Sequence, residues 1–296
     1  MLIKRNILAE RYFIELISVF KEQNWDIEES IGGEYSVFDM FCKRLEELES
    51  DADRELILEL TREYLVVDLE EYGKYMIDVF GKFIDRNKDK IGKTEVIHMF
   101  PVQDKDYPAK TKSGNVMCYL FQGNLMRRFE EFRNKRIRII ETFDGLEKYK
   151  EDIECLLLVD DFVGTGDTIL GCINLIEEKG IKKEKIKALT LVMQEQGRNA
   201  VEKYGVEIYS AVLKNRAITD NYSMEEAEKK IAQMKNISKR IKAKKELYLG
   251  YKESEGLVSM IKTPNNTFPF YWHEGKRDGK LCVAPFARRN NVGVDE

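Results

Sequence analysis

The sequence predicts an α/β fold with a mainly parallel sheet, preceded by an α-helical N-terminal region. In the first part, up to about Asn87, apolar residues recur at three- and four-residue spacing, and no proline occurs before Pro101. After Asn87, short apolar runs alternate with helical stretches, which is the pattern of a sheet covered by helices on both faces. One run, 155–159, is apolar without alternation, as expected for a strand that is buried on both faces.

The helical region begins with an amphipathic helix, and Gly32–Gly33 separates this helix from the next part of the chain. Its apolar positions, with those of the later helices, are Ile7, Phe13, Ile14, Ile17 and Phe20, then Leu56, Leu60, Tyr64 and Leu65, then Tyr72, Met76, Phe80 and Phe83. We expect residues 1–90 to form this helical region, and residues 91–296 to form a second domain.

The second part contains six expected strands, at 95–100, 116–121, 137–140, 155–159, 188–193 and 206–212. Helices are expected between them at 123–134, 168–179 and 197–204. A long charged helix is expected over 223–249, where Gly250 is placed to end it, and a further strand over 257–261.

Composition excludes several classes of protein. Hydrophobic residues make up 43% and charged residues 34% of the 296 residues, which excludes wholesale disorder. No apolar run approaches the roughly 20 residues that cross a bilayer, so no membrane association is expected. The net charge of -4 predicts no general affinity for nucleic acid. Five cysteines without a CxxC pair, and a start unlike a signal peptide, favour a cytoplasmic protein without a disulfide framework.

The most informative stretch is CLLLVDDFVGTGDTI, residues 155–169. Asp160 and Asp161 follow the apolar run at the end of the strand where open α/β sheets bind ligands. The turn Gly164-Thr165-Gly166-Asp167-Thr168 then leads into a helix, so its backbone N–H groups, its hydroxyls and the helix N-terminus can cradle one phosphate. Two acids beside such a cradle suit a sugar phosphate. The alternative is an ordinary strand–turn–helix connection.

This stretch resembles the phosphoribosyl-pyrophosphate signature of type I phosphoribosyltransferases. Asp160 and Asp161 match its acidic pair, and Thr165, Gly166 and Thr168 match its phosphate loop. Gly164 stands where a hydroxyl residue is common, and Asp167 adds a carboxylate to the loop. The resemblance implies a sheet of the type I phosphoribosyltransferase kind with a C-terminal hood-like segment. It also implies that Asp160 and Asp161 hold ribose hydroxyls while residues 164–168 hold the 5-phosphate.

The tail narrows the resemblance to one family. The segment TPNNTFPFYW, residues 263–272, and the later APFAR, residues 284–288, are similar to the phosphoribosyltransferase-like family of bacterial conflict (antiviral defence) systems. The similarity covers roughly residues 91–290. It implies a phage-defence setting, which no motif of this chain indicates by itself.

Further candidates each have a structural alternative. Lys112, Ser113 and Gly114 are candidates for the loop that wraps the diphosphate, or form a solvated loop. Asn265 and Asn266 are candidates for reading a base or acceptor, or form a tight turn. His98 is interpreted as a core residue, with a catalytic role as the alternative. Phe270 and Trp272 are interpreted as core residues, with stacking on a ring as the alternative. Arg288 and Arg289 are either phosphate ligands or tail residues. The basic run 229–245 is interpreted as the charged face of a packed helix, with nucleic-acid contact less favoured.

The resemblance therefore implies an enzyme that binds phosphoribosyl pyrophosphate with Mg²⁺ and transfers phosphoribose to an unidentified nitrogen acceptor. In the family, Mg²⁺ is bound through the diphosphate and not directly by the protein. The alternatives are a non-catalytic subunit that binds phosphoribosyl pyrophosphate or a nucleotide as a signal, and an assembly subunit that docks a protein partner. The candidate contacts for such a partner are residues 1–90 and the 223–249 helix.

Overall fold

The computed structural model describes residues 8–32, 34–103, 113–123, 128–277 and 280–288. The chain forms two compact units: residues 68–215 form one, and residues 1–67 together with 216–296 form the other. We call them the sheet unit and the split unit. Compact packing does not show which parts fold independently, so the division into 1–90 and 91–296 stays a prediction.

The sheet unit contains five parallel strands. These are β2 (Val96–Pro101), β3 (Arg136–Ile139), β4 (Leu156–Val163), β5 (Ile186–Gln194) and β6 (Glu207–Lys214), and their order across the sheet is β3-β2-β4-β5-β6. Every pair of neighbours is parallel. The α/β fold and its parallel sheet, predicted from alternation and from the unbroken apolar run, are confirmed.

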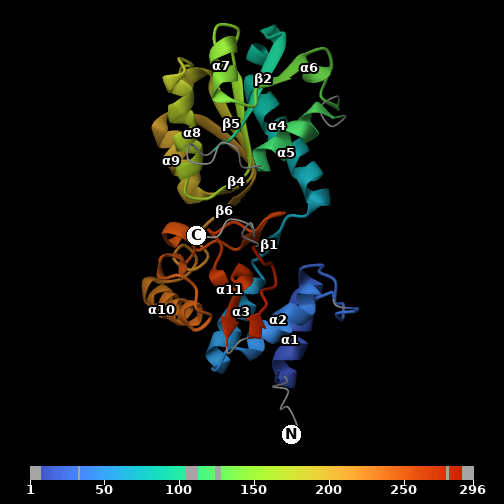
Figure 1. Ribbon diagram of the computed structural model, residues 1–296, viewed down its shortest axis with the longest axis vertical. Coiled ribbons are helices and arrows are strands. Elements are labelled where there is room, and N and C mark those ends of the chain that lie inside the picture. The colour runs from blue at the N-terminus through green and yellow to red at the C-terminus, as the bar shows by residue number, and fades with distance from the viewer. Residues whose placement is uncertain (1–7, 33, 104–112, 124–127, 278–279, 289–296) are drawn as a thin grey trace. The chain divides into compact units, whose positions relative to one another are not determined.

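Helices cover both faces of this sheet (Figure 1). One face carries α4 (Leu69–Lys93), α5 (Ser113–Gln122) and the single turn α6 (Glu130–Arg133), where the rings of Phe80 and Phe121 lie 4.2 Å apart. The other face carries α7 (Phe143–Tyr149), α8 (Asp167–Glu178) and α9 (Glu195–Tyr204), with a short 3-10 turn η2 (Lys183–Lys185) before β5. Coverage of both faces explains why β4 begins with four apolar residues, Leu156–Val159, and why every residue of β5 is buried.

Three expectations about elements were wrong. Residues 116–121 form a helix, α5, and not a strand: the helix buries Gly114, Met117, Cys118 and Phe121, whose spacing is helical, but a short apolar run does not reveal its period. Of the helix expected over 123–134, the described residues form one helical turn, α6.

The third wrong expectation is the length of the charged helix, which was expected over 223–249. It is α10 (Met224–Arg240), which ends early because Lys242 adopts a left-handed conformation with φ of 58°. The N–H of Ala243 then donates to the carbonyl of Ser238, which closes the helix end without a glycine.

The split unit is built from two segments that are distant in the sequence, residues 1–67 and 216–296. Its helices are α1 (Glu10–Glu22), α2 (Val37–Glu46), α3 (Asp51–Thr61), α10 and α11 (Pro269–Trp272), with 3-10 turns η3 (Lys245–Leu247) and η4 (Tyr251–Glu253). Strand β1 (Leu65–Val66) pairs in parallel with β7 (Val258–Ser259), and β8 (Gly275–Arg277) pairs antiparallel with β9 (Lys280–Cys282). Aromatic rings from both segments fill its core, with Tyr64 and Phe286 stacked at 4.9 Å. The predicted helical N-terminal region is present.

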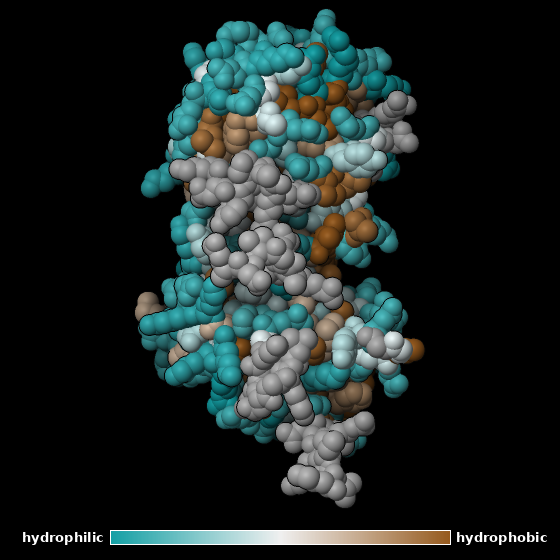
Figure 2. Space-filling view, viewed as in Figure 1, coloured by the Kyte–Doolittle hydropathy of each residue, from teal (hydrophilic) through white to brown (hydrophobic). Residues whose placement is uncertain are grey.

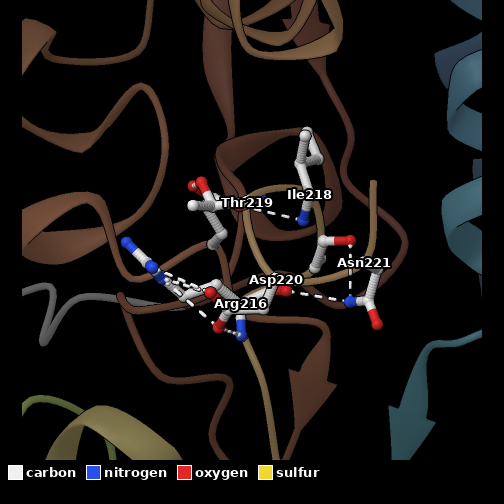
Figure 3. Close-up of polar contacts among 7 residues, drawn as sticks. Arg216, Ile218, Thr219, Asp220 and Asn221 are labelled. Atoms are coloured by element: carbon white, nitrogen blue, oxygen red, sulfur yellow. Dashed lines mark hydrogen bonds and ion pairs between the residues drawn. The ribbon is translucent and has the colours of Figure 1, made fainter. Parts of the chain in front are cut away.

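A buried carboxylate organises the turn that opens the second segment of the split unit. Figure 3 shows this turn, with Arg216, Ile218, Thr219, Asp220 and Asn221 labelled. Glu255, 2% exposed, accepts hydrogen bonds from the backbone N–H groups of Ile218 at 2.9 Å and Thr219 at 2.8 Å. Arg216 and Asp220 form an ion pair of 2.7 Å across the same turn. Glu255 therefore satisfies buried donors that no strand or helix would satisfy.

Most of the charged residues lie on the surface. The face shown in Figure 2 is largely hydrophilic, with apolar patches between the polar side chains. Ion pairs along α10 (Lys229–Glu225, Lys230–Glu59, Lys235–Glu253 and Arg240–Glu49) support the interpretation of this basic run as the charged face of a packed helix. Among the helices that the structure describes, none has the length and apolar character required to cross a membrane.

Candidate functional site

The topology of the sheet unit points to one place for a ligand site, at the carboxyl ends of β2 and β4. From β2 the chain moves outward to β3, then returns past β2 to β4 on its other side. The strand order therefore reverses between β2 and β4, and open α/β sheets bind ligands outside the carboxyl ends of the strands at such a point. Asp160 and Asp161 lie near the carboxyl end of β4. Helix α5 begins at the same place: Oγ of its first residue, Ser113, donates a hydrogen bond of 2.7 Å to Asp160 Oδ1.

The acidic pair is held from both sides. Asp160 Oδ1 accepts from Ser113 and also, at 2.9 Å, from the backbone N–H of Asp161. Asp161, which is 8% exposed, accepts at Oδ2 a hydrogen bond of 2.5 Å from the hydroxyl of Tyr72 on α4. Burial, and then the neighbouring charge of Asp161, raise the pKa of Asp160 well above its usual value, against the opposing bond from Ser113. The pair therefore places carboxyl oxygens side by side, where they can accept hydrogen bonds from neighbouring hydroxyl groups such as those of a sugar.

The turn after β4, which begins at Gly164, leads directly into α8. Gly166 adopts a left-handed conformation with φ of 88° and stands at the N-cap of α8, where the described residues provide no side-chain cap. The first N–H groups of α8 and the positive end of its dipole therefore have no capping side chain and can take an anion. Asp167 lies in this first turn, and its Oδ2 accepts a hydrogen bond of 2.9 Å from Thr165 Oγ1. Asp167 and Thr168 are both exposed.

Two glycines set how closely other elements approach this turn. A Cβ atom on Gly197, in the first turn of α9, would lie 2.4 Å from the carbonyl oxygen of Gly164. A Cβ atom on Gly114 would lie 2.6 Å from the carbonyl oxygen of Val159. The first turns of α9 and α5 therefore pack directly on the backbone of β4 and its turn, which no side chain would allow.

The structure gathers only some of the predicted site residues. Asp160, Asp161, Ser113, Gly114 and the turn 164–168 all belong to the sheet unit and lie at the carboxyl end of β4. Lys112 lies outside the described residues. Asn265 and Asn266 belong to the split unit, where the buried Asn266 side chain donates to Ser254 Oγ at 3.2 Å.

Sequence reasoning missed two residues at this site, Tyr72 and Gly197. For Tyr72 the sequence shows only helical spacing of apolar residues, which predicts that the side chain is buried but not that it contacts Asp161. Gly197 carried a usable signal, because a glycine in the first turn of an otherwise polar helix indicates a close approach of two backbones.

The remaining candidates are mostly part of the core. Phe270 is fully buried, and Trp272 Nε1 donates at 2.7 Å to the carbonyl of Thr267, as expected for packing residues. His98 is 1% exposed, and neither ring nitrogen has a hydrogen-bond partner among the described residues. Burial and the nearby Arg138 lower the pKa of His98, so the ring is neutral in the core. Arg288 donates to the carbonyl of Thr263 at 2.9 Å, and Arg289 lies outside the described residues.

Similar proteins include a xanthine phosphoribosyltransferase from Clostridium acetobutylicum, 34% identical over 65 residues that make up 22% of this chain. The match spans 34% of the length of that curated relative. Among solved structures, HGPRT-ase from Leishmania tarentolae is 17% identical over 52% of this chain and 82% of its own, with a TM-score of 0.35. Orotate phosphoribosyltransferase from Aeropyrum pernix is 15% identical over 49% and 72%, with a TM-score of 0.30.

A family model covers far more of the chain than these pairwise matches. The model of the PRTase-CE family matches residues 44–281, which is well over half of the chain. The matched range includes the whole sheet unit, with the acidic pair and the turn after β4. The chain therefore belongs to the PRTase-CE family.

Proposed function

We propose that the protein is a phosphoribosyltransferase that binds phosphoribosyl pyrophosphate with Mg²⁺ and transfers the phosphoribosyl group to a nitrogen acceptor. The observation that carries the proposal is the placement of a buried acidic pair beside a helix N-terminus without a side-chain cap, where the strand order reverses. Membership of the PRTase-CE family and the match to a xanthine phosphoribosyltransferase support the same reaction class.

In this proposal each part of the site has one role. Asp160 and Asp161 accept hydrogen bonds from the ribose hydroxyls, and residues 164–168 hold the 5-phosphate through backbone N–H groups. Ser113 and Gly114, together with Lys112, would bind the diphosphate. The bond from C1 to the diphosphate oxygen breaks and the diphosphate leaves with the electron pair. The acceptor nitrogen forms the new bond to C1 and loses its proton to solvent.

In this proposal Mg²⁺ arrives with the substrate, bound through its phosphates. Within the described part of the chain, no group of three or more His, Cys, Asp or Glu side chains could hold a metal ion. Mg²⁺ commonly binds through substrate phosphates with few protein ligands. When bound, it would neutralise charge on the departing diphosphate. The antiviral-defence and cytoplasmic setting also belongs to the proposal and depends on the resemblance of the tail and on composition.

Calorimetric titration of phosphoribosyl pyrophosphate with Mg²⁺ tests the proposal. The wild type should bind, and the Asp160→Asn/Asp161→Asn variant should lose about 10- to 100-fold in affinity for each charged acceptor removed. The matched control is Asp85→Asn/Asp89→Asn, which makes the same charge change on exposed positions of α4 in the same unit and should bind like the wild type.

The outcomes separate the candidate functions. Binding followed by pyrophosphate release with a nitrogen nucleophile supports the transferase. Binding without release would instead assign the site to a signal-sensing subunit. A folded wild type that does not bind would contradict both.

A further inference from the structure

Helix α4 reaches the acidic pair through one side chain. Tyr72 lies in the first turns of α4 and is 1% exposed. The start of this helix is fixed independently, because Asp68 Oδ1 caps the N–H groups of Glu70 and Glu71 at 2.8 and 2.9 Å. The N–H of Tyr72 donates to the carbonyl of Asp68 at 3.0 Å. The tyrosine hydroxyl is therefore carried to Asp161 by a rigid element that precedes the acidic pair by about ninety residues.

The hydrogen bond between Tyr72 and Asp161 has the short length of a charge-assisted hydrogen bond. Its length of 2.5 Å is typical of a hydroxyl that donates to a charged carboxylate. This hydrogen bond holds Oδ2 of Asp161 in place in a buried environment. It therefore restricts the orientation of the carboxylate and the direction in which Oδ1 points. Ser113 does the same for Asp160 from α5. Each of the two acids thus has its own hydroxyl donor from a different helix.

Two adjacent buried carboxylates need such donors. Like charges at this separation repel, and burial disfavours the charged form of a carboxyl, which is why the pKa of Asp160 is raised. A donor that binds the charged form offsets these effects, and a donor that does so in one fixed geometry also orients the acceptor. A phenylalanine at position 72 would fill the same apolar space, so packing alone does not explain the hydroxyl.

We propose that Tyr72 is a positioning residue of the phosphoribosyl site, whose hydroxyl orients Asp161 toward the ribose hydroxyls. The inference rests on the proposed function and adds α4 to the elements that build the site. Tyr72 acts through Asp161 and has no contact with the reacting atoms.

The test compares Tyr72→Phe with a matched control. Tyr209→Phe removes another buried hydroxyl of the sheet unit, 4% exposed, that donates at 2.6 Å to the carboxylate of Glu207 at the amino end of β6. Affinity for phosphoribosyl pyrophosphate with Mg²⁺ should fall about tenfold in Tyr72→Phe and stay unchanged in Tyr209→Phe. In the free protein, the ¹³C chemical shift of the Asp161 carboxyl should change in Tyr72→Phe, which removes its hydrogen bond, and should stay unchanged in Tyr209→Phe.

A double-mutant cycle separates positioning from general packing. If Tyr72 acts only through Asp161, then adding Tyr72→Phe to Asp161→Asn should leave the affinity of Asp161→Asn unchanged. A wild type that binds no phosphoribosyl pyrophosphate refutes the proposed function, and the positioning role with it. If the wild type binds, then equal affinity in Tyr72→Phe, or an Asp161 carboxyl chemical shift that Tyr72→Phe leaves unchanged, overturns the positioning role alone. A further loss in the double variant overturns it as well.

Discussion

Replacing Gly197 by alanine should disturb the turn after β4 through a single methyl group. The new Cβ would lie 2.4 Å from the carbonyl oxygen of Gly164 and 2.9 Å from Val163 Cγ1. Ordinary contacts of this kind begin near 3.4 Å, so α9 or the turn must move by up to about 1 Å. The two neighbours are a backbone carbonyl and a branched side chain, and neither can rotate away.

The energetic effect follows from this overlap. Overpacking by one methyl group in a close-packed region costs about 1–3 kcal/mol. For a domain of this size each kcal/mol lowers the melting temperature by about 2–4 °C. Because the displaced turn is the proposed phosphate cradle, a shift of about 1 Å should also weaken binding of phosphoribosyl pyrophosphate, by up to about 100-fold.

Urea denaturation and calorimetric titration measure the two effects on the same samples. Gly171→Ala is the matched control, because Gly171 lies inside α8 and no described heavy atom stands within 4 Å of the place that an added methyl group would take. There alanine should stabilise the protein by about 0.5–1 kcal/mol, since it restricts the unfolded chain and favours the helix. If Gly197→Ala matched the stability and affinity of the wild type, α9 would not set the position of the turn.

Three further predictions concern buried charges. Because the pKa of Asp160 is raised above its ordinary value of 3.8, the native state holds this proton more tightly, and stability falls as pH rises from that value through the raised one. Asp160→Asn should therefore gain stability over the wild type in urea denaturation, more at about pH 9 than at about pH 5, and a constant difference would contradict this cause. Glu255→Ala should lose about 3–5 kcal/mol by stranding two buried N–H groups, whereas Glu255→Gln keeps an acceptor and should lose about 1–2; equal losses in chemical denaturation would refute this account. Arg44, fully buried, donates to the carbonyls of Phe270 and His273, so Arg44→Met should cost about 3–5 kcal/mol, and a neutral effect on the melting temperature would argue against these bonds.

Much of the sheet unit could be predicted because its signals are local. The apolar runs of β4 and β5 are long, and the turn after β4 carries its glycines and acids in one continuous stretch. The same local reasoning failed for α5, whose apolar face spans one short run that either period explains. It also failed at the end of α10, where Lys242 adopts a conformation that glycine usually supplies.

The rest of the site depends on contacts between distant residues. The pairing of Tyr72 with Asp161 needs α4 to pack on the sheet, and helical spacing in α4 shows that one face is buried but not against which element. Ser113 was a candidate for the diphosphate, and its bond to Asp160 emerges only when β2 and β4 are neighbours. Such partners depend on topology, which a single sequence does not state.

The discontinuity of the split unit has a consequence for synthesis on the ribosome. Residues 1–67 are translated before the sheet unit, but their aromatic core is completed by residues such as Tyr271 and Phe286, which are translated after it. The intervening stretch of about 150 residues takes roughly 7–30 s at ordinary elongation rates. During this time the helices of residues 8–61 carry an apolar surface without its partner. We expect protease to cut nascent chains arrested after residue 215 within the first 67 residues and to spare the same residues in the released protein.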